Sequence, residues 1–429
     1  MAVIDALPTD TVMRASDGTP LKVKLRQAQR REQIRALMLI APLFIFIFVS
    51  FIIPIGNMMR NAFYDPDIKD NLPQTVKLLA DWDGKDVPGE DVFAALAADM
   101  KAASKIKTVA LVGKRLNYEV PALKSKVVVT ARKIDKLEQG PWKDAIIGID
   151  PVWGELNTWA VVKRASSTIT SFYLLSVLDL RQTVDGGIEH MPADRSIYVQ
   201  ILGRTLGISL LVTLCTLVLG YPVAYMLATV PQKHASILMI FVLLPFWTSL
   251  LVRTTAWTVL LQDGGMFAQL IDHTGITWLL NVLGLAEGTP PLFKTRFATV
   301  LAMTHIQLPF TLLPIYSVMK TISPTYMRAA KSLGGTPLYS FLKIYMPQTI
   351  PGVAAGCLLT FILSLGYFIT PALVGGPTDN MIAGFIDTAM NSEGNWGKAS
   401  ALGFVLLTAT MILYYVYNKL IGIDNMKLG

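Results

Sequence analysis

Several polar side chains lie inside long apolar stretches of this 429-residue chain, and their chemistry most needs an explanation. A polar group is costly in hydrocarbon, so each of them needs a hydrogen-bond partner or contact with a polar solute. Ser and Thr often bond to their own helix backbone, and Arg253 could reach lipid headgroups instead. The candidates for lining a path for a polar solute are Trp247, Thr248, Ser249, Arg253, Trp257, Gln307, Ser364, Tyr367 and Asp379.

Carboxylates and aromatic rings, the groups that hold an amine-bearing cation, lie mainly in the connections between the apolar stretches. A solvated surface explains the acids equally well, and an aromatic belt at the membrane interface explains the rings. These residues alone therefore do not identify a solute. The acids are Asp263, Asp379, Asp387 and Glu393, and their aromatic neighbours are Trp257, Tyr367, Phe368 and Trp396.

The sequence predicts neither catalysis nor metal binding. It has four histidines, none grouped with carboxylates, and it lacks zinc-ligand spacing, a phosphate-binding glycine loop and a nucleophile elbow. We therefore expect no catalytic residue, no metal site and no cofactor bound by this chain. His305 and Gln307 could form a hydrogen-bonded pair in the core as easily as line a path.

The composition places the chain in a membrane. Hydrophobic residues make up 52% of it and charged residues 16%, which is too apolar for a soluble enzyme of this length. A span needs about 20 apolar residues, and we expect six, at 36–58, 206–228, 236–251, 298–319, 350–374 and 399–421. The third of these is the least regular, because Pro245 can break it and the apolar run continues to Leu261.

Basic residues predict the orientation of the spans. Six lysines and arginines between residues 22 and 35 precede the first span, and such residues tend to stay in the cytoplasm. Each span carries the chain to the other side of the membrane. The amino terminus, residues 323–347 and the carboxyl terminus are therefore all expected in the cytoplasm. The formal net charge of +8 then reflects topology and anionic lipid, so nucleic acid is not expected as a partner.

Residues 59–200 fall on the opposite side and are numerous enough for a small domain. Residues 91–106 are amphipathic and predict a helix, whereas the three valines within 125–131 predict a strand. Residues 168–180 are apolar but too few to span, which predicts a core or interfacial helix. We therefore expect an α+β insert, without a disulfide because Cys215 and Cys357 lie in spans.

Residues 323–347, SPTYMRAAKSLGGTPLYSFLKIYMP, form a polar and basic island between two apolar runs. The Ser-Pro pair at 323–324 predicts the start of a short helix, which Gly334 can end in a left-handed turn. The Thr-Pro pair at 336–337 repeats the start signal. The island therefore predicts two short helices joined by a hinge.

The second of these helices would carry an apolar face, because residues three and four apart share a side of a helix. Pro347 is expected to end it. Such a face predicts docking onto another protein rather than a membrane span. The face consists of Leu338, Phe341, Leu342 and Tyr345.

The spacing within the island resembles the cytoplasmic signature of ABC importer permeases, Glu-Ala-Ala, three residues, Gly, nine residues, Ile-x-Leu-Pro. Arg328 stands where the acidic residue is usual and Met346 where Leu is usual, which puts an ion pair through that Glu in doubt. The resemblance implies docking onto an ATPase through Arg328, Ala329, Ala330, Gly334, Leu338, Phe341, Ile344, Tyr345 and Pro347.

Further stretches resemble the branch of this family that imports spermidine, putrescine and similar solutes. They are residues 204–225, 244–257, 369–376 and 395–396. The resemblance covers about 204–421 and the first span, but not the insert. It implies an all-α membrane protein with six transmembrane helices of the type I ABC importer kind.

The resemblance also implies a function and a set of partners. The chain would be a permease subunit in the bacterial inner membrane that moves a polyamine or a related small polar or cationic solute by alternating access. It would not be an enzyme itself. Its partners would be an ABC ATPase dimer that binds ATP and Mg, a second homologous permease subunit, an extracytoplasmic solute-binding protein and membrane lipid.

Other classes stay open on the sequence alone. An ion-coupled secondary transporter should show buried acids or inverted halves, and neither is evident. A scaffold or sensor would act mainly through its extracytoplasmic domain, and a membrane-embedded enzyme would need a catalytic grouping. The expected organisation is a basic tail at 1–35, a helix at 36–58, an insert at 59–200, a five-helix core at 201–421 with a coupling loop at 323–347, and a tail at 422–429.

Overall fold

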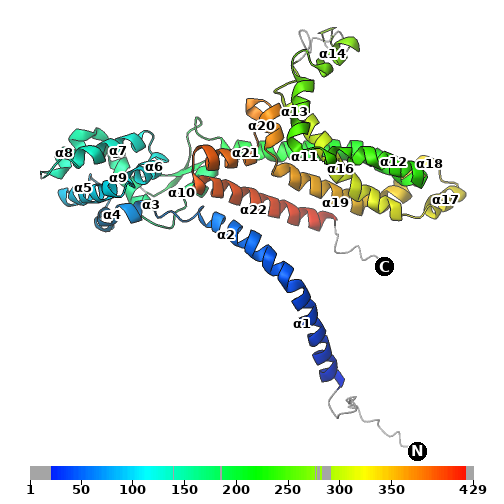
Figure 1. Cartoon of the computed structure of the whole chain (residues 1–429), viewed down its shortest axis with the longest axis horizontal. Helices are drawn as coiled ribbons and strands as arrows, with labels where there is room; N and C mark the ends of the chain where they lie inside the picture. Colours follow the sequence, from blue (N-terminus) through cyan, green and yellow to red (C-terminus); the bar gives the residue numbers. More distant parts are fainter. Residues whose placement is uncertain are drawn as a thin grey trace, which may run out of the picture. The chain divides into compact units, whose positions relative to one another are not determined.

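The computed structural model describes residues 21–138, 140–183, 186–275, 277, 281–282 and 291–421. These residues are mostly helical, and the chain divides into two compact units, Met1–Arg60 and Asn61–Gly429 (Figure 1). Residues 1–20 of the predicted amino-terminal tail and the predicted tail at 422–429 lie outside the described residues.

The first unit is one continuous helix built from α1 (Leu21–Ile47), the π-helical turn η1 (Phe48–Ile52) and α2 (Ile53–Arg60). Its 33 residues Ala28–Arg60 are long and apolar enough to cross a membrane, and none of its most apolar window is buried by the protein. The helix includes the predicted span at 36–58. Its bare apolar surface suits contact with lipid.

The insert begins the second unit and is a bundle of short helices with one small hairpin. Strands β1 and β2 pair antiparallel, with Leu180 opposite His190 and Gln182 opposite Ile188. The elements are α3 (Asp67–Asn71), α4 (Pro73–Leu79), α5 (Glu90–Lys105), α6 (Val109–Asn117), α7 (Leu123–Ile134), α8 (Trp142–Ile149), η2 (Pro151–Gly154), α9 (Leu156–Ala165), α10 (Phe172–Val177), β1 (Leu180–Gln182) and β2 (Ile188–His190).

Three buried aromatic residues pack together within the largely aliphatic core of the insert. Phe93 and Trp159 meet edge to face with their ring centroids 4.8 Å apart, and Trp153 lies 5.8 Å from Trp159. Both indole nitrogens are satisfied, since Trp153 Nε1 donates to Thr130 Oγ1 and Trp159 Nε1 donates to the carbonyl of Trp153. Both cysteines of the chain are free, so apolar packing stabilises the insert.

The predicted α+β character of the insert is wrong. The helix expected at 91–106 is confirmed as α5, but the strand expected at 125–131 is part of helix α7. Leu123, Val127 and Ala131 recur every four residues and are buried against the core, so helical periodicity outweighs the β-propensity of the valines. The helix expected at 168–180 is only the short α10, followed by β1.

The rest of the second unit forms the membrane core (Figure 1). Helices α11, α16 and α19 pack against one another at its centre. Its elements are α11 (Tyr198–Thr229), α12 (Gln232–Leu243), η3 (Leu244–Trp247), α13 (Leu250–Leu261), α14 (Met266–His273), α16 (Arg296–Thr321), α17 (Thr325–Ser332), α18 (Pro337–Ser340), η4 (Phe341–Tyr345), α19 (Met346–Leu365), α20 (Ile369–Val374), η5 (Pro377–Asp379), α21 (Ile382–Asp387), η6 (Thr388–Ser392) and α22 (Trp396–Ile421).

Small and hydroxyl-bearing residues bring the three central helices together. A Cβ placed on Gly356 of α19 would lie 2.5 Å from the carbonyl oxygen of Thr311 in α16, so only glycine permits this approach. At the same level the Thr311 hydroxyl bonds both Thr216 of α11, at 2.8 Å, and Thr360 of α19, at 2.6 Å. These contacts satisfy polar groups that lipid could not.

Five helices are long and apolar enough to cross a membrane, and a bent pair raises the number to six among the described residues. The pair is Gln232–Trp247 and Leu250–Leu261, which meet at 95°. This break bears out the expectation that the third span is interrupted near Pro245. The predicted span 350–374 has different limits, because its helix ends at Leu365 and α20 follows separately.

A buried charge network links α6 to Asp65 near the start of the insert and to Tyr173 of α10. Arg115 of α6 bonds Asp65 at 2.7 Å and Glu119 at 3.0 Å, and the Tyr173 hydroxyl donates to Asp65 at 2.6 Å. Burial alone would lower the pKa of Arg115, but Glu119, Tyr173 and Asp65 give a net rise, so the guanidinium stays charged. Lys114 Nζ also donates to the carbonyl of Gly394, just before α22.

Candidate functional site

The polar island at 323–347 folds largely as its capping residues predict. Helix α17 is followed by Gly334 at a φ of +86°, in the left-handed region that favours glycine. Thr336 then caps α18, because its hydroxyl accepts a hydrogen bond from the backbone N–H of Tyr339 at 3.3 Å. The first short helix, the hinge after it and the start of the second helix are therefore confirmed.

The predicted stop at Pro347 is wrong. Helix α18 continues through the π-helical turn η4 into α19, so that residues Pro337–Leu365 form one continuous helix. Pro347 lies at the start of α19, directly after a turn in which the N–H of Met346 bonds the carbonyl of Phe341. The wider π-helical turn accommodates the proline ring without ending the helix. The second half of the island is thus a direct extension of a span.

The predicted docking face divides into a buried and an exposed part. Phe341 and Tyr345 stack on each other and pack edge to face against Tyr225 of α11, and Tyr345 is only 7% exposed. They therefore fix this part of the island to α11. Leu338 is 68% exposed and Leu342 is 47% exposed, so these two side chains are free to contact another protein.

The remaining predicted docking residues lie around this exposed part. Arg328 and Ala329 on α17 are exposed, as are Ile344 and Pro347 near the start of α19, while Ala330 is half-buried. Sequence reasoning missed Leu333, Tyr339 and Tyr326, all more than half exposed. The signal that could have found them is the presence of large apolar or aromatic residues in a polar segment, outside the predicted apolar face.

The candidates for the solute path begin at the break between η3 and α13. Ser249 caps α13, since its Oγ accepts a hydrogen bond from the N–H of Val252 at 3.2 Å. The Thr248 hydroxyl donates to the carbonyl of Pro245 at 2.9 Å, and Trp247 is exposed. Two of the three side chains are therefore occupied in shaping the break.

Arg253 lies in the first turn of α13, the helix that α20 contacts through the hydroxyls of Thr254 and Thr370, which are 3.2 Å apart. Nε and Nη1 of Arg253 are covered by protein atoms and have no hydrogen-bond acceptor. Trp257, one turn further along α13, donates from Nε1 to Nδ1 of His305 at 3.2 Å.

His305 and Gln307 do not form the pair that the sequence left open. His305 bonds Trp257, whereas Gln307 accepts a hydrogen bond from the Ser364 hydroxyl of α19 at 2.7 Å. Residues two apart on a helix point in nearly opposite directions, which separates the two partners. Gln307 is buried, and its Nε2 lacks an acceptor.

Asp379 is buried and is engaged in fixing its own loop. Its carboxylate accepts a hydrogen bond from Arg296 Nε at 3.0 Å and another from the backbone N–H of Gly376 at 3.1 Å.

No Asp or Glu occurs in the helices of the membrane core that the sequence predicts as spans or that adjoin them, α11, α12, α13, α16, α19, α20 and α22. Within the described residues no group of three or more acids, histidines or cysteines could hold a metal ion.

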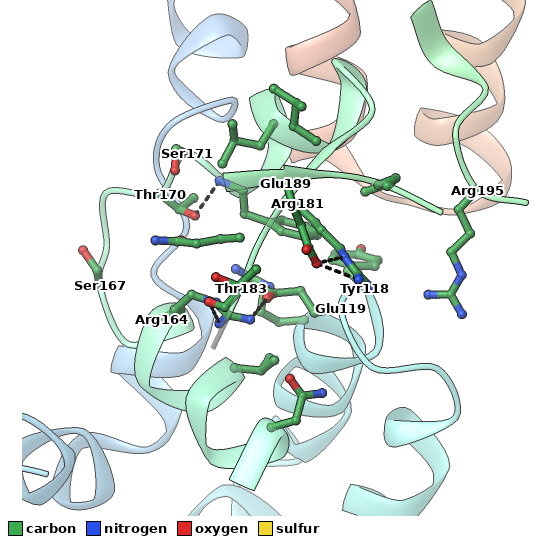
Figure 2. A pocket seen from close by; sticks show the side chains of 18 of the residues that line it. Tyr118, Glu119, Arg164, Ser167, Thr170, Ser171, Arg181, Thr183, Glu189 and Arg195 are labelled. Atoms are coloured by element: carbon green, nitrogen blue, oxygen red, sulfur yellow. Dashed lines mark hydrogen bonds and ion pairs between the residues drawn. The ribbon is translucent and has the colours of Figure 1, made fainter. Parts of the chain in front are cut away.

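The insert contains a separate cavity of about 770 Å³. Figure 2 shows its charged side chains largely paired with one another, Arg164 with Glu119 and Arg181 with Glu189. Arg195 stands apart at one side of this group. The pairing inside the cavity stabilises the hairpin against α9, since Arg164 also donates to the carbonyl of Thr183.

Comparison with known proteins identifies the class of this chain. The model of the family described as "Binding-protein-dependent transport system inner membrane component" matches residues 217–421. The spermidine/putrescine transport system permease protein PotB of Haemophilus influenzae is 31% identical over 230 residues, which are 53% of this chain and 77% of that protein. The protein of the same name from Escherichia coli is 30% identical over 221 residues, 51% and 77% of the two chains.

Two further proteins are similar. The inner membrane ABC transporter permease protein YdcU of Escherichia coli is 34% identical over 226 residues, 52% of this chain and 71% of that protein. A solved bacterial ABC transporter involved in the import of the acidic polysaccharide alginate is 17% identical, with a TM-score of 0.42 over 54% of this chain and 80% of that chain.

The chain therefore belongs to the family of binding-protein-dependent transport system inner membrane components. It is a multi-pass inner-membrane protein and the permease subunit of an ABC importer, which works with an ATPase on a separate subunit and with a binding protein. The insert lies outside the residues that the family model matches.

Proposed function

We propose that this permease imports a polyamine, such as spermidine or putrescine, or a related small polar or cationic solute. The observation that carries the proposal is the 30–31% identity to two permeases named for spermidine and putrescine transport, which extends over 77% of each. The broken helix η3–α13 and the polar residues around it provide a place within the core for a polar solute.

Residues 323–347, the coupling segment of this proposal, support a mechanism of alternating access. Exposed side chains of α17 and α18 contact a cytoplasmic ABC ATPase dimer, which binds ATP and Mg. Because α18 continues directly into α19, and because Phe341 and Tyr345 attach it to α11, a movement of the segment passes to two central spans. The ATPase state can bias the permease only if it binds the two conformations with different affinity.

A second homologous permease subunit completes the solute path. His305, Trp247 and the half-buried Trp257 and Tyr367 are accessible in this subunit, which suits residues that face a shared path. Both termini and the coupling segment lie in the cytoplasm, and the insert lies outside, where a solute-binding protein delivers its cargo. The basic residues before the first span support this orientation.

Uptake of labelled putrescine and spermidine tests the proposal directly. Cells from which the gene for this chain is deleted should lose saturable uptake of at least one of them, and the unaltered gene should restore it. Uptake of a neutral sugar serves as the control for membrane energy. Unchanged uptake of both amines after deletion, in cells that lack other polyamine importers, would refute the proposal.

A further inference from the structure

Helix α10 of the insert packs against α22, near the start of that span (Figure 1). Tyr173 and Val177 of α10 are buried in one apolar cluster with Ala401 and Leu402 of α22. A Cβ atom on Gly397 would overlap the ring of Tyr173, so this ring lies directly on the backbone of α22. The close approach fixes α10 against the last span of the core.

The ring of Tyr173 is held in place by polar groups of the insert. Its hydroxyl donates to Asp65 at 2.6 Å, and Arg115 bonds Asp65 in turn at 2.7 Å. A second bond reaches the segment before α22, because Lys114 Nζ donates to the carbonyl of Gly394 at 2.8 Å. The insert is therefore attached beside α22 by both apolar packing and hydrogen bonds.

Asp179, two residues beyond the end of α10, attaches the insert to α11. Its carboxylate accepts hydrogen bonds from the backbone N–H groups of Ile197, Tyr198 and Val199, at 3.0, 3.0 and 2.8 Å. These groups lie at the start of α11, where unpaired N–H groups and the helix dipole favour a negative charge. Asp179 is only 4% exposed, and its own carbonyl accepts a bond from the N–H of Met191 at 2.8 Å.

The insert thus contacts two spans that otherwise pack mainly on different neighbours. Helix α11 packs mainly against α16 and α19, whereas α22 packs mainly against α10 and α21. Lys398 Nζ of α22 lies 5.3 Å from the ring centroid of Tyr198, the residue of α11 whose N–H bonds Asp179. Tyr225, which packs on the coupling segment, lies about 40 Å further along α11.

We propose that α10 and Asp179 form a clamp, which ties the start of α22 to the start of α11 throughout the transport cycle. Tyr173 and Asp179 are its positioning residues, and they act on transport through the two spans. The ATPase moves α11 and α19 through the coupling segment, and the clamp makes α22 follow α11. The inference goes beyond the proposed function and holds for any solute.

The distance between the two clamped ends tests the proposal in the complete importer. Gln200→Cys on α11 and Trp396→Cys on α22 replace exposed residues and carry spin labels, in a background where Cys215 and Cys357 are alanine. Double electron-electron resonance should give one narrow distance distribution, the same without nucleotide and with a non-hydrolysable ATP analogue. A distance that differs between these two states would overturn the proposal, because the two spans would then separate during the cycle.

Gly397→Ala disrupts the first contact of the clamp, because the added methyl group takes the place of the Tyr173 ring. The distance distribution should broaden in this variant. Gly403→Ala is the matched control, since it makes the same change on the same helix and its Cβ meets no atom within 4 Å. Alanine favours the helix at both positions. An unchanged distribution in Gly397→Ala would show that this contact does not hold α22.

Asp179→Asn tests the second contact of the clamp, and it decides the question if Gly397→Ala does not accumulate in the membrane. The change removes the negative charge at the start of α11, so the distribution should broaden here too. Asp194→Asn removes an exposed carboxylate from the same connection and is the control. Equal distributions in Asp179→Asn and Asp194→Asn would contradict the role of Asp179.

The ratio of ATP hydrolysis to uptake separates a clamp from a contact that only stabilises the fold. In proteoliposomes, the ATP hydrolysed per putrescine taken up should rise in Gly397→Ala and stay unchanged in Gly403→Ala. An equal fall in hydrolysis and uptake in Gly397→Ala would overturn a role in transport, since it indicates loss of folded protein. The distance measurement needs no solute, so failure of the unaltered importer to take up putrescine would refute the proposed function and leave the inference standing.

Discussion

At the scale of the residue, Gly334 determines how the coupling segment turns between α17 and α18. Its φ of +86° is unfavourable for most residues by about 1–2 kcal/mol, although a Cβ added there would meet no atom within 4 Å. A substitution at Gly334 therefore acts through backbone conformation and through what it presents to the ATPase.

We predict that Gly334→Asp abolishes uptake while the protein stays in the membrane, because it adds bulk and negative charge to the docking surface. Gly334→Asn is the matched control, since Asn and Asp tolerate the left-handed region similarly and differ in charge. Uptake and membrane content are measured together. Normal uptake by the Asp variant would contradict a docking role for this turn.

The residues of the coupling segment could be predicted only in part. The signals at Thr336 and Gly334 are local, because a cap and a left-handed glycine depend on neighbouring residues, and both are found. The packing of Phe341 and Tyr345 against Tyr225 depends on a helix about 120 positions away in sequence. Periodicity shows that a face is apolar but not which element covers it.

At the scale of the element, the contact between α16 and α19 depends on the absence of side chains. Cβ atoms on Gly352 would lie 2.9 Å from the carbonyl oxygen of Pro314, and those on Gly356 still closer to that of Thr311. Backbone atoms cannot move aside as a flexible side chain can. The two helices would have to separate to accommodate even a methyl group.

We predict that Gly356→Ala destabilises the solubilised protein by about 1–3 kcal/mol, the usual cost of overpacking. Gly207→Ala on α11 is the control, because a Cβ there meets nothing within 4 Å and alanine favours a helix. Thermal unfolding in detergent measures both. Equal melting temperatures for the two variants would show that α16 and α19 do not approach as closely as described.

Elements with a long, regular pattern were the most predictable from sequence. The apolar spans follow from length and composition, and α5 from its amphipathic period. The α7 region was mistaken for a strand because three adjacent valines favour β structure locally, whereas the helical spacing of Leu123, Val127 and Ala131 is visible only over a longer window. The passage of the helix through Pro347 depends on a π-helical turn, which has no clear sequence signal.

At the scale of the whole molecule, the proposed orientation places the insert outside and the coupling segment in the cytoplasm. Lys105 at the end of α5 and Lys331 in α17 are both exposed, and each is replaced by cysteine in a background where Cys215 and Cys357 are alanine. A membrane-impermeant maleimide should label Lys105→Cys in spheroplasts, but Lys331→Cys only after permeabilisation. The reverse pattern would invert the topology.

The central claim is that this chain works as one permease subunit within an importer. Co-purification from native membranes under mild conditions, with mass identification of every subunit, tests it most directly. We predict an ABC ATPase and a second permease in the purified complex, and loss of the ATPase in Gly334→Asp. Recovery of this chain alone, under conditions that preserve a known importer from the same membranes, would contradict the account.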